Sequence, residues 1–348
     1  MKQFVHDATG SRVVFGAGAI VGVRDELAGL GSRPLMLVDD MIVQTAGPIL
    51  PTIRELSVAV IDRVRQHVPL ADADAARSVA RDSDADCIAV LGGGSAIGLA
   101  KAIALTEGLP ILAVPTTYAG SEMTPIWGLT EGGVKTTGRH PVVAPRVIIY
   151  DPELTVTLPS HLTATSGLNA LAHCIDALWA PGASPLTDVM AARGIQALAE
   201  SLELAVHHGS DLDARARVLV GAWLAGATFG IAGSSVHHKL CHALGGRFDL
   251  PHADTHAALL PWSVRLATAR LPESALTICQ ALDAEDAFEG VRDLESRLGV
   301  MTTLADLGLS RSDLQPLVDQ LDLDKLAFPV PLERRELDEL MDGAVSGL

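Results

Sequence analysis

Aromatic side chains are scarce in this chain of 348 residues, where phenylalanine, tyrosine and tryptophan together make up 3%. A core must therefore be built from alanine, valine, leucine and isoleucine, a composition typical of packed helices and buried parallel strands. Hydrophobic residues reach 48% and charged residues 20%, which suits a soluble globular protein. The length allows two domains, or one large α/β unit with a helical addition.

Basic residues are also few, with 26 lysines and arginines against 42 acidic residues and a net charge of −16. No basic patch with interleaved aromatic residues occurs, so we expect no nucleic-acid partner. An acidic protein can still bind an anionic small molecule where a few basic groups converge.

Cysteines are few and widely spaced, and none form a C-x-x-C pair; they are Cys87, Cys174, Cys241 and Cys279. This argues against a disulfide framework or a structural zinc site and indicates a reducing compartment. The first ten residues hold no apolar run, and the apolar stretch 88–105 is interrupted by three glycines and Lys101. We therefore expect no secretory signal, no membrane span and a cytoplasmic location.

The first part of the chain alternates between short apolar runs and helical patterns. Strands are expected at 12–16, 34–38, 58–61, 87–91, 110–114 and 147–150, with helices at 20–30, 71–81 and 96–105. Such alternation predicts an α/β domain with a parallel sheet. Strand signals largely cease at Asp151-Pro152, so we place this domain at residues 1–155 and a second, all-helical domain at 156–348.

A run of glycines lies between the strand at 87–91 and the following helix. It reads Gly92-Gly93-Gly94-Ser95 and matches neither G-x-G-x-x-G nor the P-loop pattern. Three glycines let backbone N–H groups approach a phosphate, and the helix N-terminus adds partial positive charge. A tight turn is the alternative, but three glycines and a serine exceed what a turn requires, so the run predicts pyrophosphate binding.

Polar residues follow two other strands of the predicted sheet. Asp39 comes directly after the strand at 34–38, where a dinucleotide enzyme holds ribose hydroxyls, although a helix N-cap explains a lone aspartate equally well. Thr116 and Thr117 begin a hydroxyl-rich loop after the strand at 110–114. A polar surface loop is the alternative there.

Histidines gather in one later stretch. Five of the twelve lie between residues 236 and 256, namely His237, His238, His242, His252 and His256. His238 and His242 are four apart and share one face of a helix, which we expect Gly245-Gly246 to end. Pro251 then sets up a turn that presents His252. Isolated histidines are usually surface or core residues, but this density predicts a site.

Another pair of polar residues lies on an earlier predicted helix. Ser166 is expected to cap this helix, on which Asn169 and His173 are four apart and share a face.

Four segments together resemble the iron-containing (group III) alcohol dehydrogenase superfamily. They are Gly92 to Ser95 with Lys101, Pro115-Thr-Thr117, Ser166 to His173, and the histidine stretch with His238, His242 and Pro251-His252. Within that superfamily, the sequence of residues 118–124, 169–174 and 252–256 is most similar to the maleylacetate reductase branch. The resemblance implies an N-terminal Rossmann-like domain, an all-α C-terminal domain of the dehydroquinate synthase-like fold, a site between them, and homodimers.

The resemblance also implies roles for individual residues. Asp39 would lie near the adenosine ribose, the Gly92–Ser95 run on the pyrophosphate, and Thr116, Thr117 and Lys135 along the rest of the cofactor. His242 would stand near the nicotinamide as proton donor. His173, His238 and His252 would bind the substrate, with Lys239 and Arg247 as candidate cationic partners for its carboxylates. The implied reaction reduces the carbon–carbon double bond of 2-maleylacetate to 3-oxoadipate. NADH is favoured because Asp39 would repel a 2′-phosphate, and NADPH remains possible.

Two positions depart from the metal-dependent members of the superfamily. Those members hold a divalent ion with an aspartate and three histidines, which match Asn169, His173, His238 and His252. A neutral amide attracts such an ion far less than a carboxylate does, and Gly98 stands where these members commonly carry an aspartate. We therefore expect no metal, although three histidines can hold zinc.

Three alternatives remain open. The first is an iron- or zinc-dependent alcohol dehydrogenase of the same superfamily. A non-redox nucleotide-binding protein is the second, and a lyase related to the dehydroquinate synthases is the third.

Overall fold

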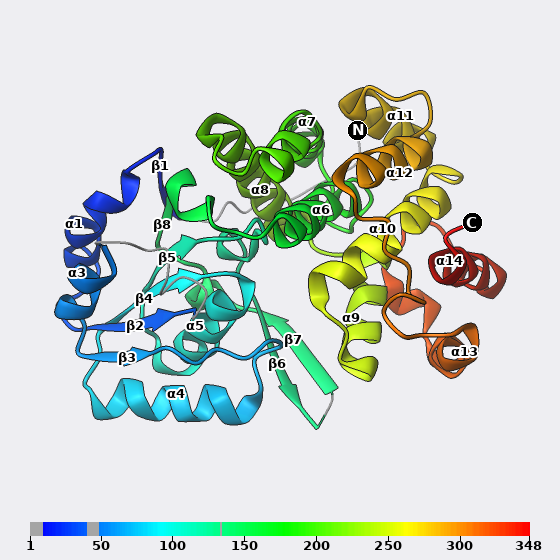
Figure 1. Cartoon of the computed structure of the whole chain (residues 1–348). Helices are drawn as coiled ribbons and strands as arrows, with labels where there is room; N and C mark the ends of the chain where they lie inside the picture. The colour runs from blue at the N-terminus through cyan, green and yellow to red at the C-terminus, as the bar shows by residue number, and fades with distance from the viewer. Residues whose placement is uncertain (1–9, 40–48, 133) are drawn as a thin grey trace. The chain divides into compact units, whose positions relative to one another are not determined.

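The computed structural model describes residues 10–39, 49–132 and 134–348. Its chain forms two compact units (Figure 1). An α/β unit contains residues 10–159 together with Gly209–Leu219, and a helical unit contains Ser160–His208 and Val220–Leu348. The predicted α/β and all-α fold class is confirmed. Gly209–Leu219 belongs to the α/β unit although it follows the first helices of the helical unit. Nothing in the sequence indicated this.

A six-stranded sheet forms the centre of the α/β unit, and all its strands are parallel. Its order is β1-β8-β5-β4-β2-β3. The strands are β1 (Arg12–Phe15), β2 (Pro34–Val38), β3 (Ala59–Ile61), β4 (Cys87–Gly92), β5 (Ile111–Pro115) and β8 (Val147–Tyr150). The inner strands β2, β4, β5 and β8 are buried along their whole length, because helices cover both faces of a parallel sheet.

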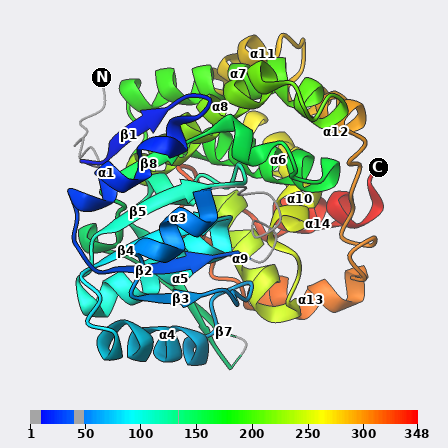
Figure 2. The same ribbon diagram turned by 60° about the vertical axis from the view of Figure 1, so that its left-hand side comes forward.

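The winding of the sheet reverses between β2 and β4. The chain moves outward from β2 to β3, then returns to place β4 on the other side of β2. One face is covered by η1 (Ala19–Gly22), α1 (Val23–Ala28) and α3 (Ile49–Leu56), and the other by α4 (Leu70–Asp82) and α5 (Gly94–Glu107) (Figure 2). Ligands of open α/β sheets bind at the carboxyl ends of the strands where the winding reverses.

A separate antiparallel hairpin, which the sequence did not reveal, follows β5. It consists of β6 (Ile126–Glu131) and β7 (Val134–Arg139). Both strands are half-buried or exposed, so they lack the apolar run that marks a central strand. Three short 3₁₀ helices complete this unit: η2 (Ser121–Met123), η3 (Pro141–Val143) and η4 (Pro152–Thr155).

The helical unit begins with α6 (Ser160–Ala177) and α7 (Pro185–His207). Next along the chain are α8 (Leu212–Ala232), which begins in the α/β unit, α9 (Val236–Phe248) and α10 (His252–Thr268). The remaining elements are α11 (Pro272–Leu282), α12 (Ala287–Leu298), α13 (Arg311–Gln320), η5 (Leu323–Leu326) and α14 (Arg334–Ser346). Helix α10 continues through Pro261.

Two predicted helix ends are wrong. Ser166 does not cap α6 but lies in its second turn, where its hydroxyl donates to the carbonyl of Leu162. Gly245-Gly246 does not end α9, which continues to Phe248. The weak helix propensity of glycine is overridden when tertiary packing holds the surrounding turns, and Leu244 and Phe248 here belong to one apolar cluster.

Among the described helices, none is by itself long and apolar enough to cross a membrane. Helices α8 and α9 reach that length and composition only as a bent pair.

Candidate active site

Three chain segments meet at the carboxyl ends of β2, β4 and β5. The backbone N–H of Asp39 donates to the carbonyl of Leu91 at 3.1 Å, and that of Thr116 donates to the carbonyl of Gly92 at 3.2 Å. The residues that follow these strands are therefore neighbours, and they lie where the winding of the sheet reverses. Asp39 and Thr117 are half-buried, and Thr116 is buried.

The glycine run is packed too closely for side chains. A Cβ added to Gly92 would stand 2.7 Å from Cβ of Ala96 and 3.0 Å from Cβ of Asp39, and one added to Gly93 would stand 2.9 Å from Cγ2 of Thr117. Helix α5 begins at Gly94, so Ser95 lies in its first turn. There the backbone N–H groups have no partner within the helix and attract an anion.

These contacts bring together most of the predicted cofactor residues. The adjoining set is Asp39, Gly92, Gly93, Gly94, Ser95, Thr116 and Thr117. Lys135 instead lies on β7, where its aliphatic chain passes 3.2 Å from the position of a Cβ on Gly128. That any of them binds a cofactor stays a prediction. Asp40, beside Asp39, is outside the described residues.

A buried lysine ties α5 to the loop after β5. Lys101 has no exposed surface, and its ammonium donates to the carbonyls of Ser121 at 2.6 Å, Thr124 at 2.8 Å and Ile126 at 3.0 Å. Burial lowers the pKa of Lys101 to about 7. These oxygens hold Nζ of Lys101 in place, so the side chain fixes the loop that begins with Thr116.

In the helical unit, imidazole rings from three helices form one cluster. The ring centroids of His173 on α6 and His238 on α9 lie 4.7 Å apart and are stacked. His256 on α10 lies 4.7 Å from His238 and 4.5 Å from His252. His242, one turn after His238, lies 6.1 Å from His252. Asn169 and His173 lie on α6, and His238 and His242 lie on α9, so all four residues are on the helices expected.

Burial determines the charge of these rings. It lowers the pKa of His173 and His237 to about 3 and that of His238 and His256 well below the usual value. These four imidazoles are therefore neutral near pH 7 without a ligand. His242 and His252 are half-buried.

Asp176, which was not among the predicted site residues, orients the cluster. Its Oδ2 lies 2.9 Å from Nδ1 of His238 and accepts the backbone N–H of Ser235 at 2.8 Å. The carboxylate thus holds the start of α9 and the ring of His238 together, although burial raises its pKa to about 6. A signal existed in the sequence, since Asp176 follows His173 by three residues on one apolar helix.

A second chain of hydrogen bonds connects Ser263 and His237 to His256 of the cluster. His237 Nδ1 is 3.0 Å from Oγ of Ser263, and its Nε2 is 2.9 Å from Nδ1 of His256. Among the described residues, three buried imidazole nitrogens have no hydrogen-bond partner: Nδ1 of His173, Nε2 of His238 and Nε2 of His256. Buried polar atoms of this kind indicate a polar ligand.

The donor set offers a divalent metal little charge at the position used by metal-dependent members. Asn169 is 4% exposed and stands one turn before His173 on α6. Its amide and the imidazole rings of His173, His238 and His252 bring no negative charge, and Asp176 contacts Nδ1 of His238 rather than its unpartnered Nε2. This chemistry fits a polar organic substrate better than a resident divalent ion.

The candidate cations for the substrate are less well placed. Arg247 is exposed and lies 5.8 Å over the ring of Phe248. Lys239 is half-buried on α9. No contact links either to the imidazole cluster within the described part of the chain, so their role stays a prediction.

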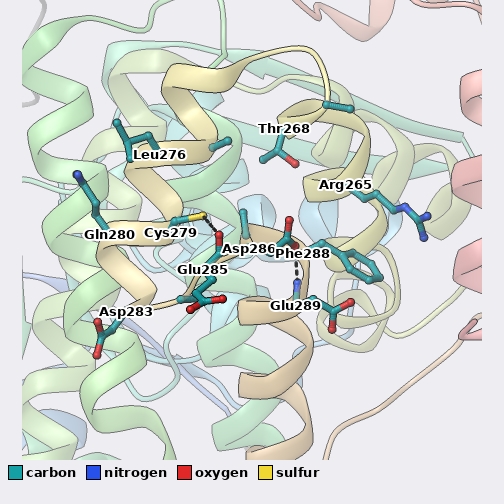
Figure 3. Close-up of a pocket in the computed structure, with 14 residues that line it drawn as sticks. Arg265, Thr268, Leu276, Cys279, Gln280, Asp283, Glu285, Asp286, Phe288 and Glu289 are labelled. Carbon is teal, nitrogen blue, oxygen red and sulfur yellow. Dashed lines mark hydrogen bonds between the residues drawn. The ribbon is translucent and has the colours of Figure 1, made fainter.

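A hollow lies elsewhere in the helical unit (Figure 3). Its volume is about 1060 Å³, and it is lined by the end of α10, by α11 and by the start of α12. Four acidic side chains line it against one arginine: Asp283, Glu285, Asp286 and Glu289, with Arg265. None of the predicted site residues is in this lining, and its charge opposes an anionic substrate.

Two family models match this chain. Residues 10–152 match the model of the iron-containing alcohol dehydrogenase family, and residues 163–341 match the model of its C-terminal region. The chain belongs to the iron-containing alcohol dehydrogenase family. It is therefore an oxidoreductase, and the predicted resemblance is confirmed.

Three individual relatives show which members of the family this chain is similar to. A maleylacetate reductase of Sphingobium indicum is 43% identical over 99% of this chain and 98% of its own length. The crystal structure of an iron-containing alcohol dehydrogenase from Corynebacterium glutamicum superposes with a TM-score of 0.93 at 41% identity, covering 100% of this chain and 98% of that one. A maleylacetate reductase from Agrobacterium tumefaciens gives 0.90 at 39% identity, with 100% and 99% covered.

Proposed function

We propose that this enzyme reduces the carbon–carbon double bond of 2-maleylacetate to give 3-oxoadipate, with NADH as hydride donor. One observation carries the proposal: a buried cluster of neutral imidazoles has an amide, Asn169, beside His173 where a metal-dependent relative would have a carboxylate. The similarity to curated maleylacetate reductases over the full length supports it.

The proposed chemistry is a conjugate reduction. Bound NADH would supply a hydride to the alkene carbon β to the ketone. The π electrons then move to the ketone oxygen as an enolate. A proton added to the α carbon restores the ketone, so one hydride and one proton are consumed for each double bond. The enolate needs hydrogen-bond donors inside a dry site.

The imidazole rings would supply those donors. We assign proton transfer to His242 and substrate binding to His173, His238 and His252, with Asn169 adding an amide N–H. A dianionic substrate beside the rings raises their proton affinity, because a nearby negative charge stabilises an imidazolium. Asp176 would hold the ring of His238 in position while this happens.

For the cofactor, we assign the pyrophosphate to the Gly92–Ser95 run and the adenosine ribose to Asp39, with Thr116, Thr117 and Lys135 along the rest. The acidic Asp39 favours NADH over NADPH, since its charge repels a 2′-phosphate. The expected homodimer and cytoplasmic location stay predictions.

An assay of NADH consumption with maleylacetate tests the proposal. We expect turnover by the wild type and a fall in kcat of about 10²-fold or more in His242→Ala, the usual contribution of a general acid. His208→Ala, at an exposed position, is the matched control and should keep full activity. Undiminished turnover in His242→Ala would remove His242 from the mechanism, and no turnover by the wild type would refute the substrate.

The metal-dependent alternative has its own test. If the reaction needs no metal, dialysis against a chelator leaves kcat unchanged, and Asn169→Asp gains affinity for zinc or iron without gaining maleylacetate reduction. If activity is lost on chelation and restored by iron or zinc, the enzyme is metal-dependent and the alternative holds.

A further inference from the structure

We propose that His237, Cys241 and His256 form a binding site for a soft transition-metal ion such as zinc or cadmium, and that an ion bound there inhibits the enzyme. Their ligand atoms all lie within 4.8 Å of one another. None of the three is among the residues that match the metal ligands of the family. The site therefore differs in ligands and in chemistry from the one expected by resemblance.

The sequence places these ligands on two helices. His237 and Cys241 are four residues apart on α9, so their side chains share one face. His256 projects from the second turn of α10. All three side chains are 1% exposed or less, which keeps water from competing for an ion once it is bound.

The distances suit a tetrahedral ion. Zinc bonds of about 2.05 Å to nitrogen and about 2.3 Å to sulfur place tetrahedral N and S ligands about 3.5 Å apart and two N ligands about 3.3 Å apart. Here Sγ of Cys241 lies 3.7 Å from Nε2 of His237, and that Nε2 lies 2.9 Å from Nδ1 of His256. The two nitrogens have to separate by a few tenths of an ångström, and all three ligand atoms already lie within 4.8 Å of one another.

Charge also balances at this position. A divalent ion with one thiolate has a net charge of +1, which is costly to bury alone. Asp176 is fully buried, and its Oδ1 accepts the backbone N–H of His237 at 3.4 Å. The carboxylate is not a ligand, but its nearby negative charge lowers the cost of burying the ion. The set at Asn169 has no anionic ligand, so a thiophilic ion prefers Cys241.

Protons can leave these ligand atoms without breaking the rest of the network. An ion on Nε2 of His237 leaves the ring proton on Nδ1, which faces Oγ of Ser263 at 3.0 Å. An ion on Nδ1 of His256 leaves its proton on Nε2. Only the thiol proton of Cys241 is then released, one for each ion bound, so affinity rises with pH.

An ion bound at this site should inhibit the enzyme because it changes the imidazole cluster. The ion replaces the hydrogen bond between His237 and His256, and His256 lies 4.5 Å from His252 and 4.7 Å from His238 between ring centroids. Fixing His256 on a metal alters the tautomer and the charge next to two rings that we assign to the substrate. The metal-free hydrogen bond is complete by itself, so the ion is an optional ligand.

Cadmium titration of the purified, full-length enzyme tests the site, with ultraviolet thiolate-to-cadmium absorption as the readout. We expect one equivalent to bind with this absorption in the wild type and in Cys279→Ser, where a half-exposed thiol is removed. Cys241→Ser should abolish the absorption and lower cadmium affinity at least tenfold. His237→Gln should lower affinity while keeping the thiol, and circular dichroism verifies the fold of each variant.

Two results would overturn the proposal. The first is absorption that survives in Cys241→Ser but disappears in Cys279→Ser, which would place the ion at the half-exposed thiol. The second is a wild type that binds no cadmium. In the NADH assay, cadmium should inhibit the wild type and Cys279→Ser alike, and Cys241→Ser should resist it at least tenfold. The titration needs no turnover, so its result is independent of the proposed substrate.

Discussion

Nδ1 of His238 lies 2.9 Å from Oδ2 of Asp176, and both side chains are buried inside the helical unit. This contact fixes the tautomer of the ring, because Nδ1 donates to the carboxylate and Nε2 is left to face a ligand. The same carboxylate accepts the backbone N–H of Ser235, so it also stabilises the start of α9.

Replacing this carboxylate tests its orienting role. We expect Asp176→Asn to lower kcat/KM for maleylacetate by about 10- to 100-fold, the usual cost of losing such an orienting partner. The amide keeps the size of the side chain and one oxygen for Ser235 and His238, so the variant removes the negative charge beside the ring rather than the contact itself. Asp188→Asn on α7, at a half-buried position, is the control. Equal kinetics in the two variants would contradict the role.

Stability should fall in acid because of the buried imidazoles. The pKa of His173 and of His237 is about 3 in the folded chain, against about 6.5 in an unfolded one. The stability that they contribute is present above about pH 6.5 and is lost as the pH falls toward 3, at about 1.4 kcal/mol per pH unit for each histidine.

Asp176 works in the opposite sense over part of this range. Its folded pKa of about 6 exceeds the unfolded value, so its contribution is present below about pH 4 and is lost as the pH rises to about 6. Two histidines outweigh one carboxyl, so we expect urea unfolding at pH 5, 6 and 7 to show decreasing stability in acid. In His237→Gln the slope should fall by about 1.4 kcal/mol per pH unit; an unchanged slope would contradict the assignment.

A pair of substitutions, one at Gly93 and one at Thr117, tests the predicted cofactor loop. Gly93→Ala should raise the KM for NADH about tenfold, because its Cβ would stand 2.9 Å from Cγ2 of Thr117. That methyl is absent in serine, so the double variant Gly93→Ala/Thr117→Ser should recover part of the loss. Gly22→Ala, where a Cβ meets nothing within 4 Å, is the control. No recovery in the double variant would mean that the contact with Thr117 is not the cause.

Lys101→Met should destabilise the α/β unit and weaken cofactor binding together. The substitution removes the donor from three buried carbonyls, and each unsatisfied group costs about 1–3 kcal/mol. Lys325→Met, at a side chain 83% exposed, should change stability by less than about 0.5 kcal/mol. Urea unfolding and titration with NADH measure the two effects, and a Lys101→Met variant as stable as the control would contradict the role of the ammonium.

The elements that could be predicted are those whose own residues decide them. The strands Pro34–Val38 and Cys87–Gly92 are buried apolar runs followed by an acid or by glycines, and this local pattern was enough. Asn169 and His173 share a face because a four-residue spacing does so on any helix.

The elements that failed depend on distant partners. Gly245-Gly246 stays helical because of packing around α9 that local propensity does not contain. Asp176 has its decisive partner, His238, 62 residues away in the chain, so the spacing from His173 could mark Asp176 as a candidate but could not identify this partner.

Arg215 has a practical consequence for dissecting this enzyme into pieces. Its guanidinium donates to the hydroxyl of Tyr118 at 3.0 Å and to the carbonyl of Gly209 at 2.9 Å, and its side chain is 1% exposed. A fragment cut after residue 159 would expose the surface that this arginine covers and would remove one hydrogen bond from the buried hydroxyl of Tyr118. The α/β unit can therefore not be produced by one truncation; it would need residues 209–219 joined back by a linker.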